Sequence, residues 1–192
     1  MVRRLLPLIL LCALSGCAYL GYLKDPFSDI PNFAAVNGSL FRGGQPRDAG
    51  WERLRALGIK TVVNLRGDNP GIERERSRAA DSGMRFIHIP MSVFDYPSDE
   101  QALRFLEAVL APQDQPVFVY CGSGRDRTGA MVAMYRVVVD GWTIKQAYRE
   151  ARQLGFWPYH GREAHLKAFV HQLKDKPSYF EKAREFRHAD KP

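Results

Sequence analysis

Cys121 begins a run of residue types that are suited to phosphate chemistry. It is followed by five residues and then by Arg127 and Thr128, within the stretch YCGSGRDRTG at residues 120–129. A thiolate is a strong nucleophile, and the planar fork of an arginine can bind two phosphate oxygens at once. This spacing points to attack of a cysteine on a phosphate ester, and its alternative is a glycine-rich turn with an inert buried cysteine.

The glycine-rich segment follows an apolar run, PVFVYC, and precedes a helix-like sequence that begins near Thr128. In such a loop consecutive backbone amides can point inward, and the N-terminus of the next helix adds the positive end of its dipole. We expect this dipole and Arg127 to favour the Cys121 thiolate, and the Thr128 hydroxyl to donate to its sulfur. The residues expected to bind phosphate are Gly122, Ser123, Gly124, Arg125, Asp126 and Arg127.

Three charged residues near this loop have more than one interpretation. Arg125 either enlarges a basic rim that favours multiply phosphorylated substrates or is solvated, and Asp126 is expected to order the loop amides or Arg125. Arg66, after the run TVVNL, could contact the substrate, brace the loop SVFDYPSDE at 92–100 or form a surface ion pair. The Walker pattern is absent, because it needs a lysine followed by Ser or Thr where Arg125 and Asp126 stand. We expect no metal and no cofactor, since the histidines lack metal-ligand spacing.

Alternating strand-like and helix-like segments surround the loop. They predict an α/β domain with a central, mostly parallel sheet of about four to five strands, flanking helices and a helical C-terminal half. Cys121 then lies at the carboxyl edge of the sheet, where such folds bind ligands. Asp48 and Ser98 are expected to cap helices. The expected strands lie within 36–46, 59–66, 84–91 and 116–121, and the expected helices within 49–58, 72–82, 99–111, 128–141, 143–155, 161–175 and from about 178.

The loop resembles the signature of cysteine-dependent phosphatases, which is Cys, five residues, Arg and then Ser or Thr. Gly124 and the Arg127-Thr128-Gly129 ending match the dual-specificity branch, and FRGGQP (41–46) and TVVNLRG (61–67) are similar to parts of its small atypical members. The likeness spans about residues 36–175. One residue departs from the family pattern, because Tyr120 stands where the family usually has a histidine.

The resemblance implies an aspartate on a loop before the cysteine as the general acid. The segment SVFDYPSDE offers Asp95, Asp99 and Glu100. Asp95 is the expected acid, because its aromatic and proline neighbours could desolvate it, whereas Asp99 and Glu100 look like the first turn of the next helix.

The family implies a phosphomonoester hydrolase with a phosphocysteine intermediate, acting on phosphotyrosine and also on phosphoserine or phosphothreonine in proteins. A phosphoinositide or inositol-phosphate phosphatase is the alternative, and a noncatalytic phosphate-binding module is a further one. The formal charge of +7 attracts anions, but basic residues alternate with acids, as in ERERSR at 73–78. We therefore expect solvated helix faces and no nucleic-acid partner.

The first residues have the layout of a bacterial export signal. Two arginines precede an apolar run, and Leu14-Ser15-Gly16-Cys17 resembles a lipobox, in which the cysteine carries lipid. We expect a membrane-anchored lipoprotein that faces the periplasm, with Ala18 favouring the outer membrane, and a plain secretory signal is the alternative. The expected organisation is a signal at 1–16, a tether at 17–35, the phosphatase-like domain at 36–175 and a polar helix or tail at 176–192. Cys121 is then the one free thiol, since Cys12 leaves with the signal.

Overall fold

A five-stranded sheet in the order β1-β2-β5-β3-β4 forms the centre of the molecule. This is a computed structural model, and it describes residues 27–156 and 164–189. β1 pairs antiparallel with β2, and the other neighbours are parallel, as the α/β interpretation predicted. The strands are β1 (Ala34–Ala35), β2 (Leu40–Gly44), β3 (Thr61–Asn64), β4 (Arg85–His88) and β5 (Val117–Cys121).

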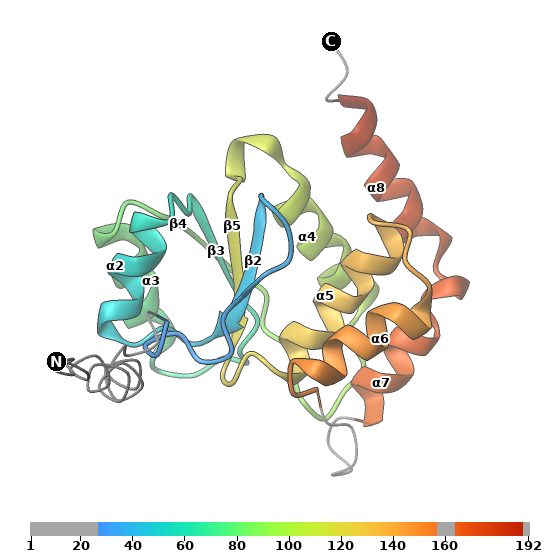
Figure 1. Cartoon of the computed structure of the whole chain (residues 1–192), viewed down its shortest axis with the longest axis horizontal. Coiled ribbons are helices and arrows are strands. Elements are labelled where there is room, and N and C mark those ends of the chain that lie inside the picture. Colours follow the sequence, from blue (N-terminus) through green and yellow to red (C-terminus); the bar gives the residue numbers. More distant parts are fainter. Residues whose placement is uncertain (1–26, 157–163, 190–192) are drawn as a thin grey trace, which may run out of the picture.

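Helices cover both faces of this sheet (Figure 1). The two helices α2 and α3 lie on one face, and α4 lies with the C-terminal helices α5–α8 on the other. Alternate residues of β5 enter two separate apolar clusters, because successive side chains of a strand point to opposite faces. The helices are α2 (Asp48–Ala56), α3 (Ile72–Asp81), α4 (Asp99–Leu110), α5 (Asp126–Val138), α6 (Ile144–Gln153), α7 (Ala164–His171) and α8 (Pro177–Ala189), with short 3₁₀ turns at Pro112–Asp114 and Leu173–Asp175.

The central strand β5 and the buried helix α5 hold the loop of interest between them. Every residue of β5 is buried, and α5 is buried continuously from Thr128 to Val138. A helix that is apolar on all sides belongs inside a core. The loop is therefore fixed at both ends by the most buried elements of the fold.

The two helix caps predicted from the sequence have different outcomes. Ser98 caps α4 with a full capping box, in which its side chain accepts from the Gln101 N–H and the Gln101 side chain accepts from the Ser98 N–H. The prediction for Asp48 was wrong, because α2 begins at Asp48 itself and its N-cap is Arg47, with no side-chain cap. An acidic residue in the first turn is still favourable there, since it faces the positive end of the helix dipole.

The described domain is larger than the expected 36–175 at both ends. Ile30, which was expected in the tether, is 1% exposed and packs in the core. At the other end Tyr179 and Ala183 of α8 are fully buried, so this helix belongs to the domain rather than to a polar tail. The proposed leader and Cys17 lie outside the described residues. In the described ranges we find no helix with the length and hydrophobicity needed to cross a bilayer.

Candidate active site

Cys121 is the last residue of β5, and α5 begins at Asp126, so the connecting loop consists of residues 122–125. The Cys121 side chain faces the larger apolar cluster and is 2% exposed, whereas Gly122 and Ser123 are exposed. The first N–H groups of a helix have no partner inside it, and the dipole makes this end favourable for an anion. The structure thus brings the cysteine, the exposed loop and the N-terminus of α5 together at one edge of the sheet.

Gly124 allows the loop to lie directly on β2. Its φ is +73°, which is the left-handed region, and a Cβ at this position would lie 2.3 Å from the Gly43 carbonyl carbon and 2.4 Å from the Gly44 nitrogen. A Cβ at Gly44 would likewise lie 2.9 Å from the Ser123 carbonyl carbon. Gly44 of FRGGQP and Gly124 of the loop are therefore required by the same close approach of two backbones.

Three donors from outside the loop hold its carbonyl oxygens. The Gln45 N–H donates to the Gly122 oxygen at 3.1 Å, and Asn32 Nδ2 donates to the Gly124 oxygen at 3.0 Å. Arg42 Nη2 donates to the same Gly124 oxygen. Because C=O and N–H point in opposite directions across a trans peptide, the amides that follow these carbonyls are turned away from these three donors. This is the orientation that a phosphate cradle requires.

Arg127 links the loop to the segment that carries the expected acid. Its Nη1 donates to the Met91 carbonyl oxygen at 3.2 Å, and its Nη2 lies 3.8 Å from where a Cβ on Gly122 would be. Arg127 Nε is buried without a hydrogen-bond partner. The guanidinium therefore lies beside the loop, as the signature predicts, with donor capacity left for a phosphate group.

The expected hydrogen bond from Thr128 to the Cys121 sulfur is not formed in the structure. Thr128 is fully buried, and its Oγ1 has no hydrogen-bond partner. Its catalytic role thus stays a prediction. Arg125 is exposed, and its methylenes lie against Gly155, where a Cβ would be 3.2 Å from Arg125 Cγ. Asp126 is the first residue of α5 and half-buried, and its predicted ordering role also stays a prediction.

The loop between β4 and α4 distinguishes the two candidate acids. Asp95 is exposed, and its neighbours Phe94 and Tyr96 are 57% and 48% exposed, so the expected desolvation is not seen in this structure. Asp99 accepts hydrogen bonds from Lys176 Nζ and from the Tyr179 hydroxyl, each at 2.6 Å. These bonds, first that of Lys176 and then that of Tyr179, lower the pKa of Asp99. Asp99 is therefore poorly suited to donate a proton, and Asp95 remains the candidate.

A buried carboxylate, Glu75, lies behind the site. Its oxygens accept from the Tyr120 hydroxyl at 2.7 Å, from Asn64 Nδ2 at 2.9 Å and from Gln45 Nε2 at 3.1 Å. Arg66 forms an ion pair with it through Nη1. Arg66 therefore braces the structure behind the site and is not a surface ion pair. Burial first, and then the negative charge of Glu75, raise the pKa of Tyr120, so this residue acts as a neutral donor.

Glu75 was missed in the sequence, because ERERSR was interpreted as a solvated helix face. The side chain of Glu75 is 6% exposed. Ile72, Glu75 and Ala79 are the buried residues of α3, at the three- and four-residue spacing of one helix face. That spacing could have indicated that Glu75 faces the core, although a charged residue is normally exposed. The network also gives the unusual Tyr120 a hydrogen-bond partner.

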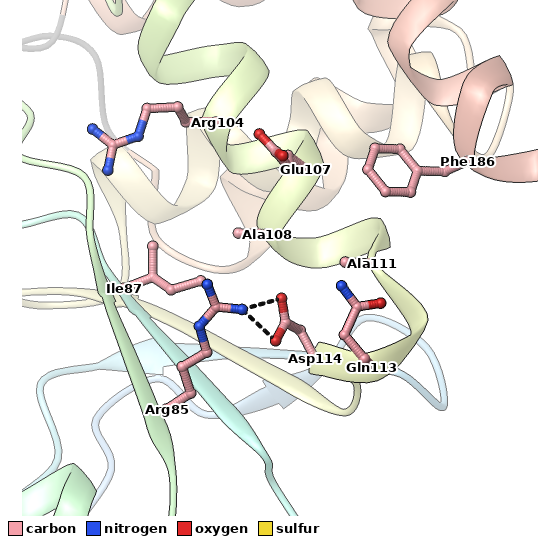
Figure 2. A pocket seen from close by; sticks show the side chains of 9 residues that line it. All are labelled: Arg85, Ile87, Arg104, Glu107, Ala108, Ala111, Gln113, Asp114 and Phe186. Carbon is pink, nitrogen blue, oxygen red and sulfur yellow. Dashed lines mark hydrogen bonds and ion pairs between the residues drawn. The ribbon is translucent and has the colours of Figure 1, made fainter. Parts of the chain in front are cut away.

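A pocket of about 330 Å³ lies at the opposite end of the sheet from this loop (Figure 2). It lies beside Arg85, the first residue of β4, whereas Cys121 is the last residue of the parallel strand β5. Arg85 Nη1 donates to both Asp114 carboxylate oxygens, at 2.6 and 2.7 Å, across its floor (Figure 2). The pocket lining comprises Arg85, Ile87, Arg104, Glu107, Ala108, Ala111, Gln113, Asp114 and Phe186.

Among the described residues no cluster of His, Cys, Asp or Glu could hold a metal ion.

Comparison with known proteins gives the same assignment as the geometry. Residues 26–164 match the family model described as a DSP-PTPase phosphatase fused to NAD+ kinase. The dual specificity protein phosphatase TpbA of Pseudomonas aeruginosa is 30% identical over 126 residues, covering 65% of this chain and 55% of TpbA. Its crystal structure superimposes with a TM-score of 0.67 at 26% identity, covering 82% of this chain and 94% of that one.

Two further relatives are named for different activities. A probable tyrosine-protein phosphatase, DG1060 of Dictyostelium discoideum, is 29% identical over 126 residues, which cover 64% of this chain and 75% of that protein. The inositol diphosphatase DSP4 of Arabidopsis thaliana is 27% identical over 124 residues, covering 62% of this chain and 61% of DSP4. The chain belongs to the DSP-PTPase family, and its fold is that of a cysteine-dependent phosphatase of the tyrosine and dual-specificity class.

Proposed function

We propose that this protein hydrolyses phosphate monoesters through a phosphocysteine at Cys121, with phosphotyrosine in proteins as its main substrate. One observation carries the proposal: Cys121 precedes, and Arg127 lies beside, an exposed loop whose carbonyl oxygens are held by donors from outside it, at the N-terminus of a buried helix. A phosphoryl group in this position would contact the loop amides and the free donors of Arg127.

The reaction takes place in two steps. The Cys121 thiolate attacks phosphorus, the P–O ester bond breaks, and the leaving oxygen takes a proton from Asp95. Water then attacks the phosphocysteine while Asp95 takes its proton, the P–S bond breaks, and inorganic phosphate and the thiolate are released. Arg127 binds the equatorial oxygens of the phosphoryl group in both steps, because its positive, planar guanidinium can donate to two of these oxygens at once.

The preference for an aryl phosphate is supported by two features. DG1060 and TpbA are named as tyrosine and dual-specificity protein phosphatases. On the loop with Asp95, Phe94 and Tyr96 expose large apolar surface, and Tyr96 is held edge-on against His165 at 4.9 Å between ring centroids. Exposed aromatic rings beside a phosphate site can pack against a tyrosyl ring.

The test is turnover of p-nitrophenyl phosphate and of a phosphotyrosyl peptide by the wild type and by Cys121→Ser. The wild type should release phosphate from both, and Cys121→Ser should lose turnover but still bind phosphate, as measured by calorimetry. Turnover in Cys121→Ser equal to that of the wild type would exclude the phosphocysteine route.

An inositol-phosphate phosphatase is the second candidate. It is supported by the exposed Arg125, which adds positive charge to the rim, and by the similarity to the inositol diphosphatase DSP4. Phosphotyrosyl peptides and inositol polyphosphates are assayed side by side at equal concentration. A kcat/KM that is higher for the inositol polyphosphates would assign the protein to the second class.

We also propose that the protein is exported and anchored by lipid on Cys17, facing the periplasm from the outer membrane. The support is the sequence LSGC after an apolar run, and acyl chains contribute about 0.8 kcal/mol for each buried methylene. Metabolic labelling with palmitate should be seen in the wild type and be absent in Cys17→Ser. Labelling that persists in that variant would contradict the proposed attachment site.

A further inference from the structure

Arg42 lies beneath the phosphate loop on the same side of the sheet as Cys121. In the parallel register of β2 and β5, Arg42 is opposite Val119 and Gly44 is opposite Cys121. Paired residues of neighbouring strands point to the same face, so the Arg42 side chain starts two pairs before the nucleophile and on its side. It is 1% exposed and the largest fully buried side chain of the described domain.

The guanidinium of Arg42 is only partly satisfied by the protein. Its Nη2 donates to the Gly124 oxygen, while Nε and Nη1 are buried without a hydrogen-bond partner. None of the ion pairs seen within residues 27–156 and 164–189 involves Arg42. A buried cation without a counter-charge is costly, and folds normally retain one only where an anion compensates it.

The charged groups around Arg42 indicate which anion this is. Burial lowers the pKa of Arg42 to about 10, and the charge of Cys121 opposes this more strongly than any other group. Glu150 of α6 also opposes it, but this carboxylate is bound to Arg136 at 2.6 Å, and Arg136 acts on Arg42 in the reverse sense. Arg42 therefore stays protonated near neutral pH, and the next side chain on the same face of the neighbouring strand β5 is that of Cys121.

We propose that Arg42 is a positioning residue of the phosphate site, which fixes the Gly124 carbonyl and supplies from beneath the loop the positive charge that favours the Cys121 thiolate. The inference deepens the proposed function and rests on it for the phosphoryl-transfer step. Tyr120 lies on the opposite face of the sheet as a neutral donor, so it supplies no positive charge beside Cys121.

Three variants separate the charge of Arg42 from its hydrogen bond. Arg42→Gln keeps a donor and removes the charge, whereas Arg42→Lys keeps the charge and removes the fork. Asn32→Ala is the control, because it removes the other donor to the Gly124 oxygen, together with its bond to the Leu154 oxygen, and leaves the charge of Arg42 in place. Arg42→Met is a second neutral variant whose unbranched chain fills similar space, in case Arg42→Gln does not fold.

The readout is the pH at which iodoacetamide alkylates Cys121 at half its maximal rate, with folding checked by circular dichroism. We expect this midpoint to rise by about one to two pH units in the neutral variants, a roughly 10- to 100-fold lower thiolate population below the midpoint. It should stay near the wild-type value in Arg42→Lys, measured below pH 7, and in Asn32→Ala. KM for p-nitrophenyl phosphate at pH 6 should change less than kcat.

Two results would overturn the inference. One is a folded neutral variant whose midpoint equals that of the wild type, and the other is an Asn32→Ala midpoint that rises as far as that of Arg42→Gln. Alkylation does not require turnover, so failure of the proposed function is recognised separately, as a wild type that alkylates with the expected pH dependence but releases no phosphate from any ester.

Discussion

Gly124→Ala is the substitution for which the structure gives the most definite expectation. Alanine in the left-handed region costs about 1–2 kcal/mol. The new methyl would also lie 2.3 Å from the Gly43 carbonyl carbon and 2.5 Å from its oxygen, and these atoms belong to a buried strand that cannot rotate away. Overpacking of this kind costs about 1–3 kcal/mol, so we expect a total loss of about 2–5 kcal/mol in the free energy of unfolding.

The displaced loop should also lose catalysis. A shift of about 1 Å in a positioned group can lower the rate about 100-fold, so kcat for p-nitrophenyl phosphate should fall by this order. The matched control is Gly83→Ala, because Gly83 has the same φ of +73° but no heavy atom within 4 Å of the added Cβ. Urea unfolding should show only the backbone cost in this control, with unchanged kcat. Equal stability losses in the two variants would refute the argument from backbone contact.

Three further predictions concern the acid loop and the buried network. Asp95→Asn should slow hydrolysis of esters with poor leaving groups by about 100-fold while sparing p-nitrophenyl phosphate, and equal losses for both would contradict its role as the acid. Tyr120→Phe removes the 2.7 Å bond to buried Glu75, and urea unfolding should show a loss of about 1–3 kcal/mol, whereas unchanged stability would show that the bond contributes nothing. Tyr179→Phe removes a bond to Asp99, whose pKa is lowered by a lysine first and by this hydroxyl second. A lowered carboxylate pKa means that the bond stabilises only the ionised form of Asp99. The free energy of unfolding of Tyr179→Phe should therefore lie below that of the wild type by the full amount above about pH 4, and this difference should disappear as the pH falls through the lowered pKa. Equal differences at pH 7 and pH 3 would refute this.

The order of elements around the site was predictable because it depends on local patterns. The apolar run PVFVYC became β5, and the glycine-rich stretch became the loop before a buried helix. The helix cap at Ser98 was likewise predictable from the sequence, since its partner Gln101 lies three residues away. Errors occurred where a residue's environment came from elsewhere in the chain, as for Glu75 and for Ile30, whose burial depends on elements distant in the sequence.

The sequence by itself determined the residues on which the proposed chemistry rests: Cys121, the glycines and Arg127 stand at fixed spacing after an apolar strand, which is the pattern of a phosphate loop with a cysteine nucleophile. The tertiary structure alone decided what holds that loop. Asn32 and Arg42 reach Gly124 from 92 and 82 residues away, and Tyr120 reaches Glu75 across 45. The periodicity of a sequence segment cannot predict such contacts, because they form only when the parallel strands pair and bring their carboxyl ends to one edge of the sheet.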